Sequence, residues 1–307
     1  MREKLKMMMA FFCILLFLPY ICAVLFHNTG EAEQTFVNTM SPAQPIRTND
    51  IEQLLIGVVA AQISPDCELE IYKAQMVLSR TSLYKMLEEQ GGISLDVEQL
   101  SQYMSMGEME HRYGSEKRKE FYQQLSTASK ETAGVTIKYQ GKYIESFFYA
   151  VSSGKSRDGN SAFHSQDYGY LKNVENPYDI LADNYVKVIR ISKEELADKI
   201  NTAIHSSLSQ QELLSNIEIL QRDEADYVSE LTVAGQRMAG EEFRHLLDLN
   251  SSCFYLEEVD DSIQITTKGL GHGIGMSQYN ANELAKEGKS YQEILSYYFH
   301  DIELVSE

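Results

Sequence analysis

The chain has 307 residues, of which 43% are hydrophobic and 23% are charged, and this composition is typical of a globular protein with enough apolar residues to form a core. Its formal net charge is −18, and no cluster of Lys and Arg offers the phosphate-neutralising surface that nucleic-acid binding requires. Composition and charge therefore exclude a largely disordered chain and argue against a nucleic-acid partner.

The N-terminus has the pattern of a membrane anchor. The apolar run over residues 7–26 has roughly the 20 residues that a membrane-spanning helix needs. Arg2, Lys4 and Lys6 precede this run, and by the positive-inside rule they keep the N-terminus in the cytoplasm. A cleaved signal peptide is the competing interpretation, but the run is long for one and no small-x-small cleavage site follows it. We therefore predict a single-pass protein of the cell membrane whose folded domain is extracytoplasmic.

The predicted organisation has three parts. Residues 28–49 contain turn-forming residues and have little apolar periodicity, which is typical of a linker between membrane and domain. Asp50, followed three residues later by Gln53, has the pattern of a helix N-cap, so we expect the domain to begin there. The predicted parts are a cytoplasmic tip and membrane anchor over 1–27, a linker over 28–49 and one extracytoplasmic domain over 50–307.

The first part of the domain is predicted to be mostly helical. Apolar periodicity and capping residues indicate helices over 51–63, 67–89 and 115–132. Ser64-Pro65-Asp66 separates the first two helices, because Pro cannot continue a helix. The polar stretch that ends at Gly114 has no clear period and is predicted to be a loop.

The remainder of the domain alternates short β-patterned runs with helices. A β-hairpin is predicted over 135–150 with Gln140-Gly141 at its turn, and a Ser/Gly loop over 151–160 follows it. Further strands are predicted near residues 185–190, 215–220, 227–233, 253–258 and 262–267. Further helices are predicted from the Ser192/Glu195 cap, from Gly240 to Leu247, over 276–287, and from the Ser290/Glu293 cap to about Phe299. The predicted fold is α+β, with N-terminal helices, central strands and a C-terminal glycine-rich loop followed by helices.

The C-terminal loop is Lys268-Gly-Leu-Gly-His-Gly-Ile-Gly-Met-Ser-Gln278, which places four glycines around His272. Glycine permits positive φ and close backbone approach, and no regular helix or strand tolerates this density of it. The helix predicted after the loop adds the positive end of its dipole to the loop's N–H groups. We therefore expect the loop to bring His272, Ser277 and Gln278 up to a ligand. A tight turn around a packed histidine is the competing interpretation.

Cysteine and histidine positions bear on redox and metal chemistry. Cys13 and Cys22 fall within the predicted anchor, which leaves Cys67 and Cys253 as a possible disulfide pair that the sequence alone does not decide. No Cys/His cluster has metal-ligand spacing, so we predict no metal and no other cofactor.

Three segments in order resemble one protein family. They are Gly57-Val-Val-Ala-Ala-Gln-Ile with Lys73–Thr81, Phe147–Lys155 with Tyr170–Glu175, and Gly269–Tyr279 with Tyr291–Tyr298. Over about residues 50–303 the chain resembles the stage II sporulation protein D family, which includes the amidase enhancer LytB. The resemblance implies a membrane-anchored protein of sporulation and engulfment that faces the cell wall. It also implies binding of peptidoglycan glycan strands, lytic transglycosylase activity, and a cell-wall amidase and other engulfment proteins as partners.

The main departure from the family is at the catalytic position. The family's acid/base is a glutamate in the first segment, and the matching position here is Gln62. A lytic transglycosylase protonates the glycosidic oxygen and then deprotonates the muramic acid 6-hydroxyl, and one carboxyl group with a raised pKa can do both. A glutamine amide can do neither.

Two hypotheses therefore stay open. The first is a transglycosylase with altered chemistry, in which Glu68 or Glu70 replaces the missing acid, although Glu70 beside Lys73 is more typical of a solvated or ion-paired helix residue. The second is a catalytically silent protein that grips glycan strands and positions or stimulates an amidase.

Matching the three segments to the family, residue by residue, also gives the substrate-binding candidates. Arg80 could hold an anion with its fork or form a buried ion pair, and the loop over 152–154 could line a glycan groove or be solvated. Tyr149 stands where the family has a histidine, Ser153 where it has a glycine, and Leu270 where a tryptophan is common. The chain has no tryptophan, and its 19 tyrosines are the candidates to replace it against sugar faces. The full set of candidates is Lys73, Gln75, Arg80, Tyr149, Ser152, Ser153, Gly154, Lys155, His272, Gly273, Ser277 and Gln278.

Overall fold

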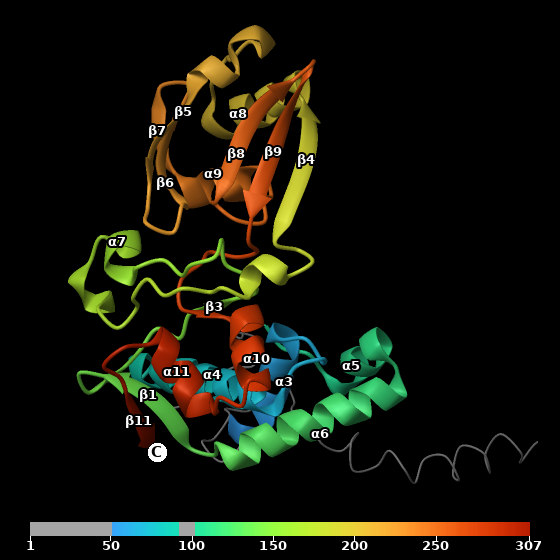
Figure 1. The fold of residues 1–307 in the computed structure, drawn as a ribbon, viewed down its shortest axis with the longest axis vertical. Coiled ribbons are helices and arrows are strands. Elements are labelled where there is room, and N and C mark those ends of the chain that lie inside the picture. The colour runs from blue at the N-terminus through green and yellow to red at the C-terminus, as the bar shows by residue number, and fades with distance from the viewer. Residues whose placement is uncertain (1–50, 92–101) are drawn as a thin grey trace, which may run out of the picture. The chain divides into compact units, whose positions relative to one another are not determined.

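The computed structural model describes residues 51–91 and 102–307 (Figure 1). The predicted anchor, the predicted linker and the Asp50 cap lie outside these residues, so the predicted domain boundaries stay predictions. Within the described ranges, no helix is both long enough and apolar enough to cross a membrane.

Two helices open the described chain as predicted. Helix α3 (Ile51–Gln62) is mostly apolar and buried, and α4 (Leu69–Glu89) follows it after the Ser64-Pro65-Asp66 turn. Helix α4 packs against α3, α6 (Ser115–Glu131) and the C-terminal helices, so it is the centre of this part of the core. The predicted helices over 51–63, 67–89 and 115–132 are thus confirmed, with ends that shift by one or two residues.

The loop predicted before Gly114 is wrong in part, because α5 (Met106–Tyr113) occupies it. The Ser105 side chain accepts a hydrogen bond from the Glu108 backbone N–H, and the Glu108 carboxylate accepts one from the Ser105 N–H at 2.7 Å. This reciprocal pair satisfies two backbone donors that the start of a helix leaves open. Only Met109 of this short helix is buried, so apolar periodicity could not reveal it. The Ser-x-x-Glu pattern was the available signal.

The predicted β-hairpin is confirmed only around its turn. β1 (Val135–Tyr139) pairs with β2 (Lys142–Tyr143), and Gln140 and Gly141 both have positive φ, as a two-residue hairpin turn requires. Beyond β2 the chain leaves this sheet, and β3 (Phe148–Tyr149) pairs in parallel with β10 (Met276–Ser277). The other edge of β1 pairs with β11 (Glu303–Ser306), a strand that was not predicted. Both pairings join distant segments, so no local pattern could indicate them.

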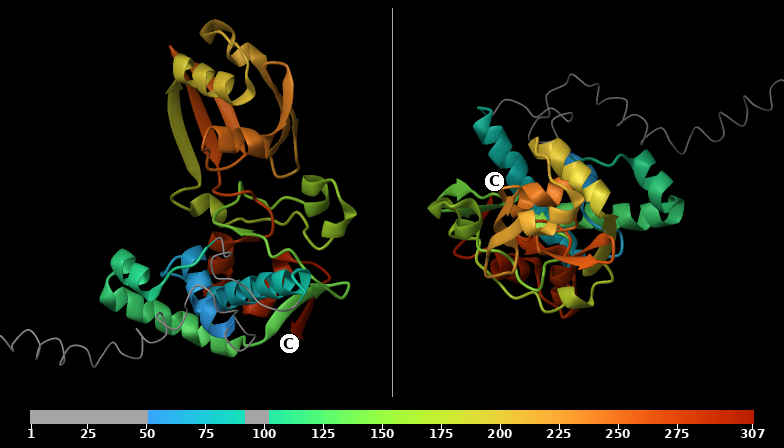
Figure 2. Two further views of the ribbon diagram at one scale, coloured as in Figure 1. Left: turned by 180° about the vertical axis from the view of Figure 1, so that it is seen from behind. Right: turned by 90° about the horizontal axis from the view of Figure 1, so that it is seen from above.

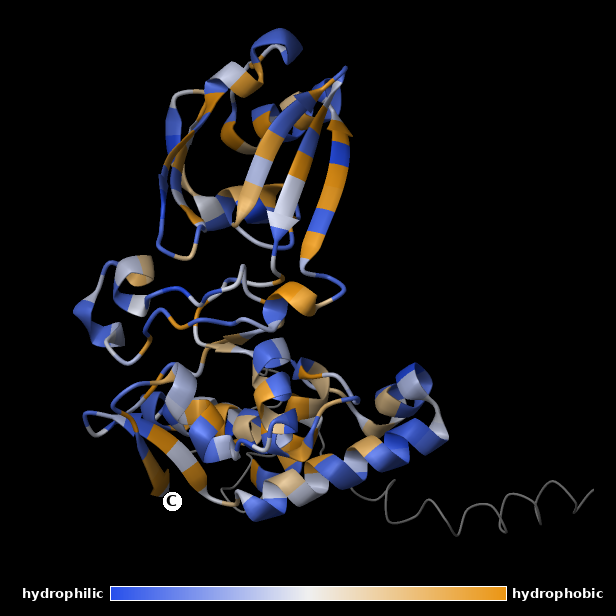
Figure 3. Cartoon of the chain, viewed as in Figure 1, coloured by the Kyte–Doolittle hydropathy of each residue, from blue (hydrophilic) through white to orange (hydrophobic). Residues whose placement is uncertain are grey.

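Two antiparallel sheets follow, and they contain all five of the further strands that were predicted. One sheet has the order β4 (Val186–Ser192), β9 (Ser262–Lys268), β8 (Phe254–Val259). The other has the order β5 (Ile217–Arg222), β6 (Val228–Val233), β7 (Gln236–Ala239), and β7 was not predicted. Figure 3 shows hydrophobic bands on β4, β8 and β9 that alternate with polar ones.

The predicted helices α8 (Lys193–Ile204) and α9 (Gly240–Leu246) pack against these strands (Figure 2). Leu196 of α8 and Phe243 of α9 join Leu231, Phe254 and Ile265 of the strands in one hydrophobic cluster. Each of these five side chains is fully buried, so α8 and α9 share a core with both sheets.

The C-terminal helices are α10 (Gln278–Lys286) and α11 (Tyr291–Tyr298). The predicted Ser290/Glu293 capping box opens α11. Helix α10 begins two residues later than predicted, because its first two predicted residues pair as β10. The short segments that join the larger elements are α7 (Gly159–Phe163), η3 (Gln166–Tyr168), η4 (Asp179–Leu181), η5 (Gln210–Glu212) and η6 (Leu214–Asn216). The α+β fold class is confirmed.

Candidate functional site

Residues from the first and third segments meet at the C-terminal end of α3. The Gln62 side-chain oxygen Oε1 accepts hydrogen bonds from Gln75 Nε2 at 2.9 Å and from Ser79 Oγ at 2.7 Å. Gln278, the first residue of α10, donates from Nε2 to the Gln62 carbonyl at 2.9 Å and to Gln75 Oε1 at 3.2 Å. Gln62, Gln75 and Gln278 are all predicted site residues, and the structure brings them together. We call Gln62, Gln75, Ser79 and Gln278 the amide cluster.

The sequence of α4 explains why the amide cluster forms. Gln75 and Ser79 are four residues apart, so they lie on the same face of the helix. Both side chains are buried, and a buried polar group without a hydrogen-bond partner is costly. Gln62 supplies the acceptor that both donors need. Its own Nε2 has no hydrogen-bond partner among the described residues, so one terminal atom of Gln62 is held and the other is available.

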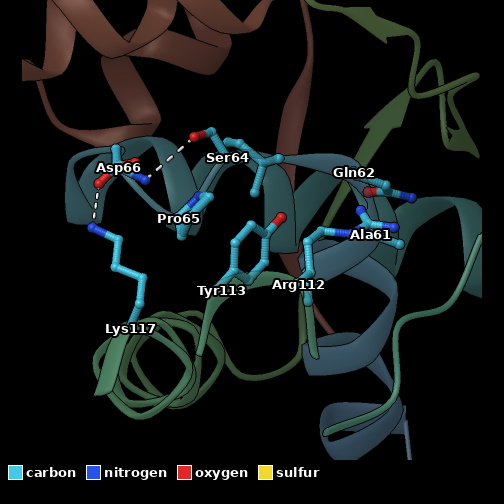
Figure 4. A pocket seen from close by; sticks show the side chains of 10 residues that line it. Ala61, Gln62, Ser64, Pro65, Asp66, Arg112, Tyr113 and Lys117 are labelled. Carbon is cyan, nitrogen blue, oxygen red and sulfur yellow. Dashed lines mark hydrogen bonds and ion pairs between the residues drawn. The ribbon is translucent and has the colours of Figure 1, made fainter. Parts of the chain in front are cut away.

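Gln62 also lines a pocket of about 600 Å³ (Figure 4). This volume lies in the usual range for small-molecule sites. The pocket is formed by the end of α3, by the turn that contains Ser64 and Asp66, and by Arg112, Tyr113 and Lys117 of α5 and α6. Among the described residues that line this pocket, Asp66 supplies the carboxylate. Lys117 forms an ion pair with it. Sequence reasoning missed Arg112 and Tyr113, because they lie on the helix predicted to be loop.

A second cluster joins the second and third segments around Asp179. Ser277 Oγ donates to the Asp179 carboxylate at 2.8 Å, and the Ser152 N–H donates to its Oδ2 at 2.6 Å. Burial raises the pKa of Asp179, and the hydrogen bonds from Ser152 and Ser277 oppose that shift. The predicted residues Ser152 and Ser277 are therefore brought together by a carboxylate that sequence reasoning missed. Nothing in its local pattern distinguishes Asp179 from a solvated aspartate.

The glycine loop is packed against the protein's own chain. A Cβ at Gly271 would lie 2.6 Å from the Tyr149 Cβ, and one at Gly275 would lie 2.1 Å from the Phe147 carbonyl oxygen. His272 Nδ1 accepts a hydrogen bond from the Ile274 N–H at 3.1 Å, and its ring makes edge contacts with Phe147 and Tyr149. Burial lowers the pKa of His272 to about 4. The competing interpretation, a turn around a packed histidine, therefore describes this loop.

The loop over residues 152–155 is also mostly buried or half-buried. The Ser153 N–H donates to the Tyr227 hydroxyl at 3.2 Å, and Gly154, with φ of 117°, donates its N–H to Ser152 Oγ at 3.0 Å. Tyr149 is buried, and its hydroxyl accepts a hydrogen bond from Asn176. Lys155 is 45% exposed and pairs with Glu175 at 2.7 Å. The Lys155 side chain is therefore one that a ligand could still reach.

Arg80 and Lys73 are held by ion pairs with glutamates. Arg80 is fully buried and donates to both Glu52 carboxylate oxygens, at 2.6 and 2.7 Å, and to the Val135 carbonyl. Of the two roles considered for Arg80, the structure therefore shows the buried ion pair. No exposed atom of its side chain remains for an anionic substrate. Burial by itself would lower the pKa of Lys73, but ion pairs with Glu131 and Glu70 outweigh it and raise that pKa.

The two glutamates considered as replacement acids have structural roles. The Glu70 carboxylate pairs with Lys73 and accepts a hydrogen bond from the Tyr291 N–H at 2.8 Å, where α11 begins. Glu68 is the residue before α4, and its N–H donates to Asn282. Neither residue lines the pocket beside Gln62. Cys67 and Cys253, whose pairing the sequence left open, are free thiols in the structure.

Gly273 gives a prediction about stability. Its φ is 75°, and a Cβ there would lie 2.4 Å from the Tyr227 ring. We expect Gly273→Val to destabilise the fold by about 2–4 kcal/mol, because left-handed strain and overpacking add. The matched control is Gly288→Val, at a position with φ of 88° and no neighbouring atom within 4 Å of an added Cβ, so it carries the left-handed strain of a valine without the contact to Tyr227. Urea unfolding measures both variants, and equal destabilisation would contradict the role of Tyr227.

Comparison with known proteins supports the resemblance seen in the sequence. A protein-family model described as "SpoIID: Stage II sporulation protein" matches residues 40–139. Stage II sporulation protein D of Bacillus amyloliquefaciens is 28% identical over 291 residues, which cover 90% of this chain and 82% of that protein. The protein of that name from Bacillus subtilis (strain 168) is 27% identical over 268 residues, or 85% of this chain and 76% of that protein. An amidase enhancer of Bacillus subtilis is 52% identical over 42 residues, which cover 14% of this chain and 6% of the enhancer. The predicted resemblance is confirmed.

Proposed function

Because this chain carries a stage II sporulation protein D domain, we propose that it acts in sporulation as a cell-wall protein that binds peptidoglycan glycan strands beside Gln62 without cleaving them. The Gln62 side chain carries this proposal. Gln75 and Ser79 donate to its oxygen as they would donate to a carboxylate oxygen of a glutamate at this position. The amide that occupies this position does not exchange a proton near neutral pH, so the bound strand would stay intact.

The residues beside Gln62 suit a strand of sugars. The pocket offers the Tyr113 ring, a surface on which a sugar face can pack, together with polar groups from Ser64, Arg112 and Lys117. Lys117 is paired with Asp66, so Arg112 leaves the pocket with net positive charge in an otherwise acidic protein, and the lactyl and peptide carboxylates of peptidoglycan carry the complementary charge. These features support glycan binding in the pocket rather than binding of an uncharged apolar ligand.

A non-cleaving protein of this kind would act through a partner. The stretch that is 52% identical to an amidase enhancer supports a cell-wall amidase as that partner. We infer that the bound chain holds glycan strands where the amidase can reach their peptide stems. The other engulfment proteins suggested by the resemblance belong to the same proposal.

Lytic transglycosylase activity is the second candidate, and the Asp66 carboxylate in the same pocket favours it. The Asp66 carboxylate is held in an ion pair with Lys117, so it is not free to approach a glycosidic oxygen in the pocket. The geometry therefore favours binding over cleavage.

Glycan binding can be tested with the full-length chain extracted in detergent. We expect it to sediment with purified peptidoglycan sacculi and to release no 1,6-anhydro-muropeptides detectable by mass spectrometry. Arg112→Ala should weaken sedimentation by about tenfold, since charge-assisted contacts are among the stronger ones. The matched control is Lys119→Ala, an exposed α6 residue outside the pocket, which should bind as the native protein does. Failure to sediment, or equal binding by both variants, would contradict the proposed site.

Membrane anchoring is part of the proposal and has its own test. We expect the intact mass of the membrane-extracted protein to include residues 1–26, because the apolar run is long for a cleaved signal. Detergent extraction followed by mass spectrometry measures this directly. A mature form that begins near residue 28 would show cleavage instead and would remove the anchor.

A further inference from the structure

We propose that this protein has a second saccharide-binding site, separate from the pocket beside Gln62, formed by a row of aromatic side chains and the pocket at its end. The row consists of Phe147, Phe163, Tyr168, Tyr170 and Tyr139, and we call it the aromatic row. Its expected ligand is a β-linked chain of N-acetylhexosamines. The inference rests on the proposed function for the identity of the polymer, and on the structure for the position of the site.

Consecutive rings of the aromatic row are in contact. Ring centroids are 5.3 Å apart between Phe147 and Phe163, and 4.4 Å apart between Phe163 and Tyr168. Tyr168 lies 6.4 Å from Tyr170, which lies 5.1 Å from Tyr139. The spacings are those of favourable aromatic pairs, so the rings hold one another in place. The short α7 and η3 segments end at Phe163 and Tyr168.

The row is exposed where a ligand could reach it. Phe163 is 37% exposed, and Phe147, Tyr139 and Tyr168 are half-buried. Tyr170 is buried, and its hydroxyl accepts a hydrogen bond from the Glu145 N–H at 2.9 Å, so it supports the row from beneath. Contiguous apolar surface that stays partly exposed is a feature of ligand-binding and interaction sites, which supports a ligand that covers these rings.

A pocket of about 340 Å³ lies at the Tyr139 end of the row. Its walls come from the β1–β2 turn, from η3 and from the end of α4. Lys85 is ion-paired with Glu145, and Lys142 is the other cation in this lining. Besides Lys142, the groups that remain for a ligand are mainly two neutral amides and one carboxylate. These are the side chains of Gln140, Gln166 and Asp167, all of which are exposed.

This combination fits a sugar better than the other ligand classes. A hexose ring offers an apolar C–H face to an aromatic ring and hydroxyl or acetamido groups to amides and carboxylates around the rim. A phosphate or nucleic acid would require a cluster of unpaired cations. A purely apolar ligand would leave Gln140, Gln166 and Asp167 without partners.

The second site is distinct from the first but shares α4 with it. Gln75 belongs to the amide cluster and Lys85 lines the second pocket, ten residues further along the same helix. At 1.5 Å per residue, that separation is about 15 Å along the helix axis. One rigid helix therefore sets the distance between the two proposed sites. A glycan strand of several sugars could be held at both points.

The absence of tryptophan from the chain allows a direct test, because a single introduced indole reports alone. We would introduce Tyr168→Trp into the full-length detergent-extracted protein and titrate it with the β-1,4-linked tetramer of N-acetylglucosamine. We expect a saturable change in emission. The same indole at Leu220, which is exposed on β5, is the matched control and should not respond. Phe163→Trp is a second reporter at an exposed position, in case the first substitution disturbs folding.

Added Phe163→Ala should raise the Kd reported by Trp fluorescence of the Tyr168→Trp protein by about threefold to tenfold, the range expected for one aromatic stacking contact. Added Arg112→Ala should leave this Kd unchanged, since Arg112 belongs to the other pocket. A silent reporter, an equal response from the Leu220 control, or an unchanged Kd after Phe163→Ala would overturn the inference. A saturable response combined with failure of sacculus binding would instead contradict the proposed function alone.

Discussion

Gln62→Glu is expected to release 1,6-anhydro-muropeptides from peptidoglycan that the native protein leaves intact. Glutamine and glutamate have nearly the same shape, so the change should cost little in packing. One new carboxylate oxygen would accept the hydrogen bonds that Gln75 and Ser79 now donate to the Gln62 oxygen. The other would take the place of Nε2, which has no partner among the described residues, and when protonated it could donate to the glycosidic oxygen.

The expected gain over the native protein is about 10²–10⁴-fold, the usual contribution of general acid–base catalysis. Two effects oppose each other at the new carboxyl group. Burial against α3 and α4 would raise its pKa toward the acid role, whereas donation from Gln75 and Ser79 would favour the charged form. Because Gln75 and Ser79 would both donate to the same carboxylate oxygen, they favour the charged form of the new glutamate. We therefore expect cleavage activity to be greatest below neutral pH, where its protonated form is better populated.

The matched control for this variant is Gln53→Glu, which adds the same charge to an exposed position on the same helix. It should release no product. Product from the native protein would show that another group transfers the proton, and Asp66→Asn would then identify or exclude the carboxylate in the pocket. A Gln62→Glu protein that binds sacculi but stays silent would show that other departures, such as Tyr149, have also removed catalytic function.

The second large effect is a loss of stability in mild acid that originates at His272. Its pKa is lowered from 6.5 to about 4, because burial disfavours the charged ring and Arg244 and Arg157 add to that effect, while Glu241 opposes it. Since the folded-state pKa lies below the unfolded-state value, the unfolded chain binds a proton first as the pH falls. The stabilising contribution is therefore complete above about pH 6.5 and is lost as the pH falls toward 4.

The shift from 6.5 to about 4 corresponds to roughly 3 kcal/mol of unfolding free energy. His272→Asn should flatten this part of the pH profile, because an amide keeps an acceptor near the Ile274 N–H and does not titrate. The exposed His111 provides the matched control, and His111→Gln should leave the slope unchanged. Urea unfolding from pH 7 to pH 4 measures the difference, and parallel profiles for the native and His272→Asn proteins would contradict the assignment. Because Asp179 has a raised pKa, its protonation acts in the opposite direction, so the comparison with His272→Asn is what isolates the histidine.

Local sequence determined most of the elements of this protein. Apolar periodicity with a breaking Ser64-Pro65-Asp66 was enough for α3 and α4, because helix period and chain stiffness act over a few neighbouring residues. Alternating apolar residues likewise predicted the five strands of the two antiparallel sheets. The segment matches also placed Gln62 at the position of the family's glutamate, and the proposal of binding without cleavage rests on that match, since it depends on residue chemistry and not on position in space.

Tertiary structure alone decided which candidate residues meet. The pairing of β3 with β10, which carries Ser277 to Asp179, joins segments more than a hundred residues apart, and no local pattern encodes such a contact. Arg80 could have served either a ligand or an ion pair, and only its burial against Glu52 distinguishes the two. The glycines around His272 likewise indicated that the loop backbone comes close to another group, but they did not show which group. The approach is to Tyr149, Phe147 and Tyr227 of the same chain, because backbone freedom permits a contact and packing chooses the partner.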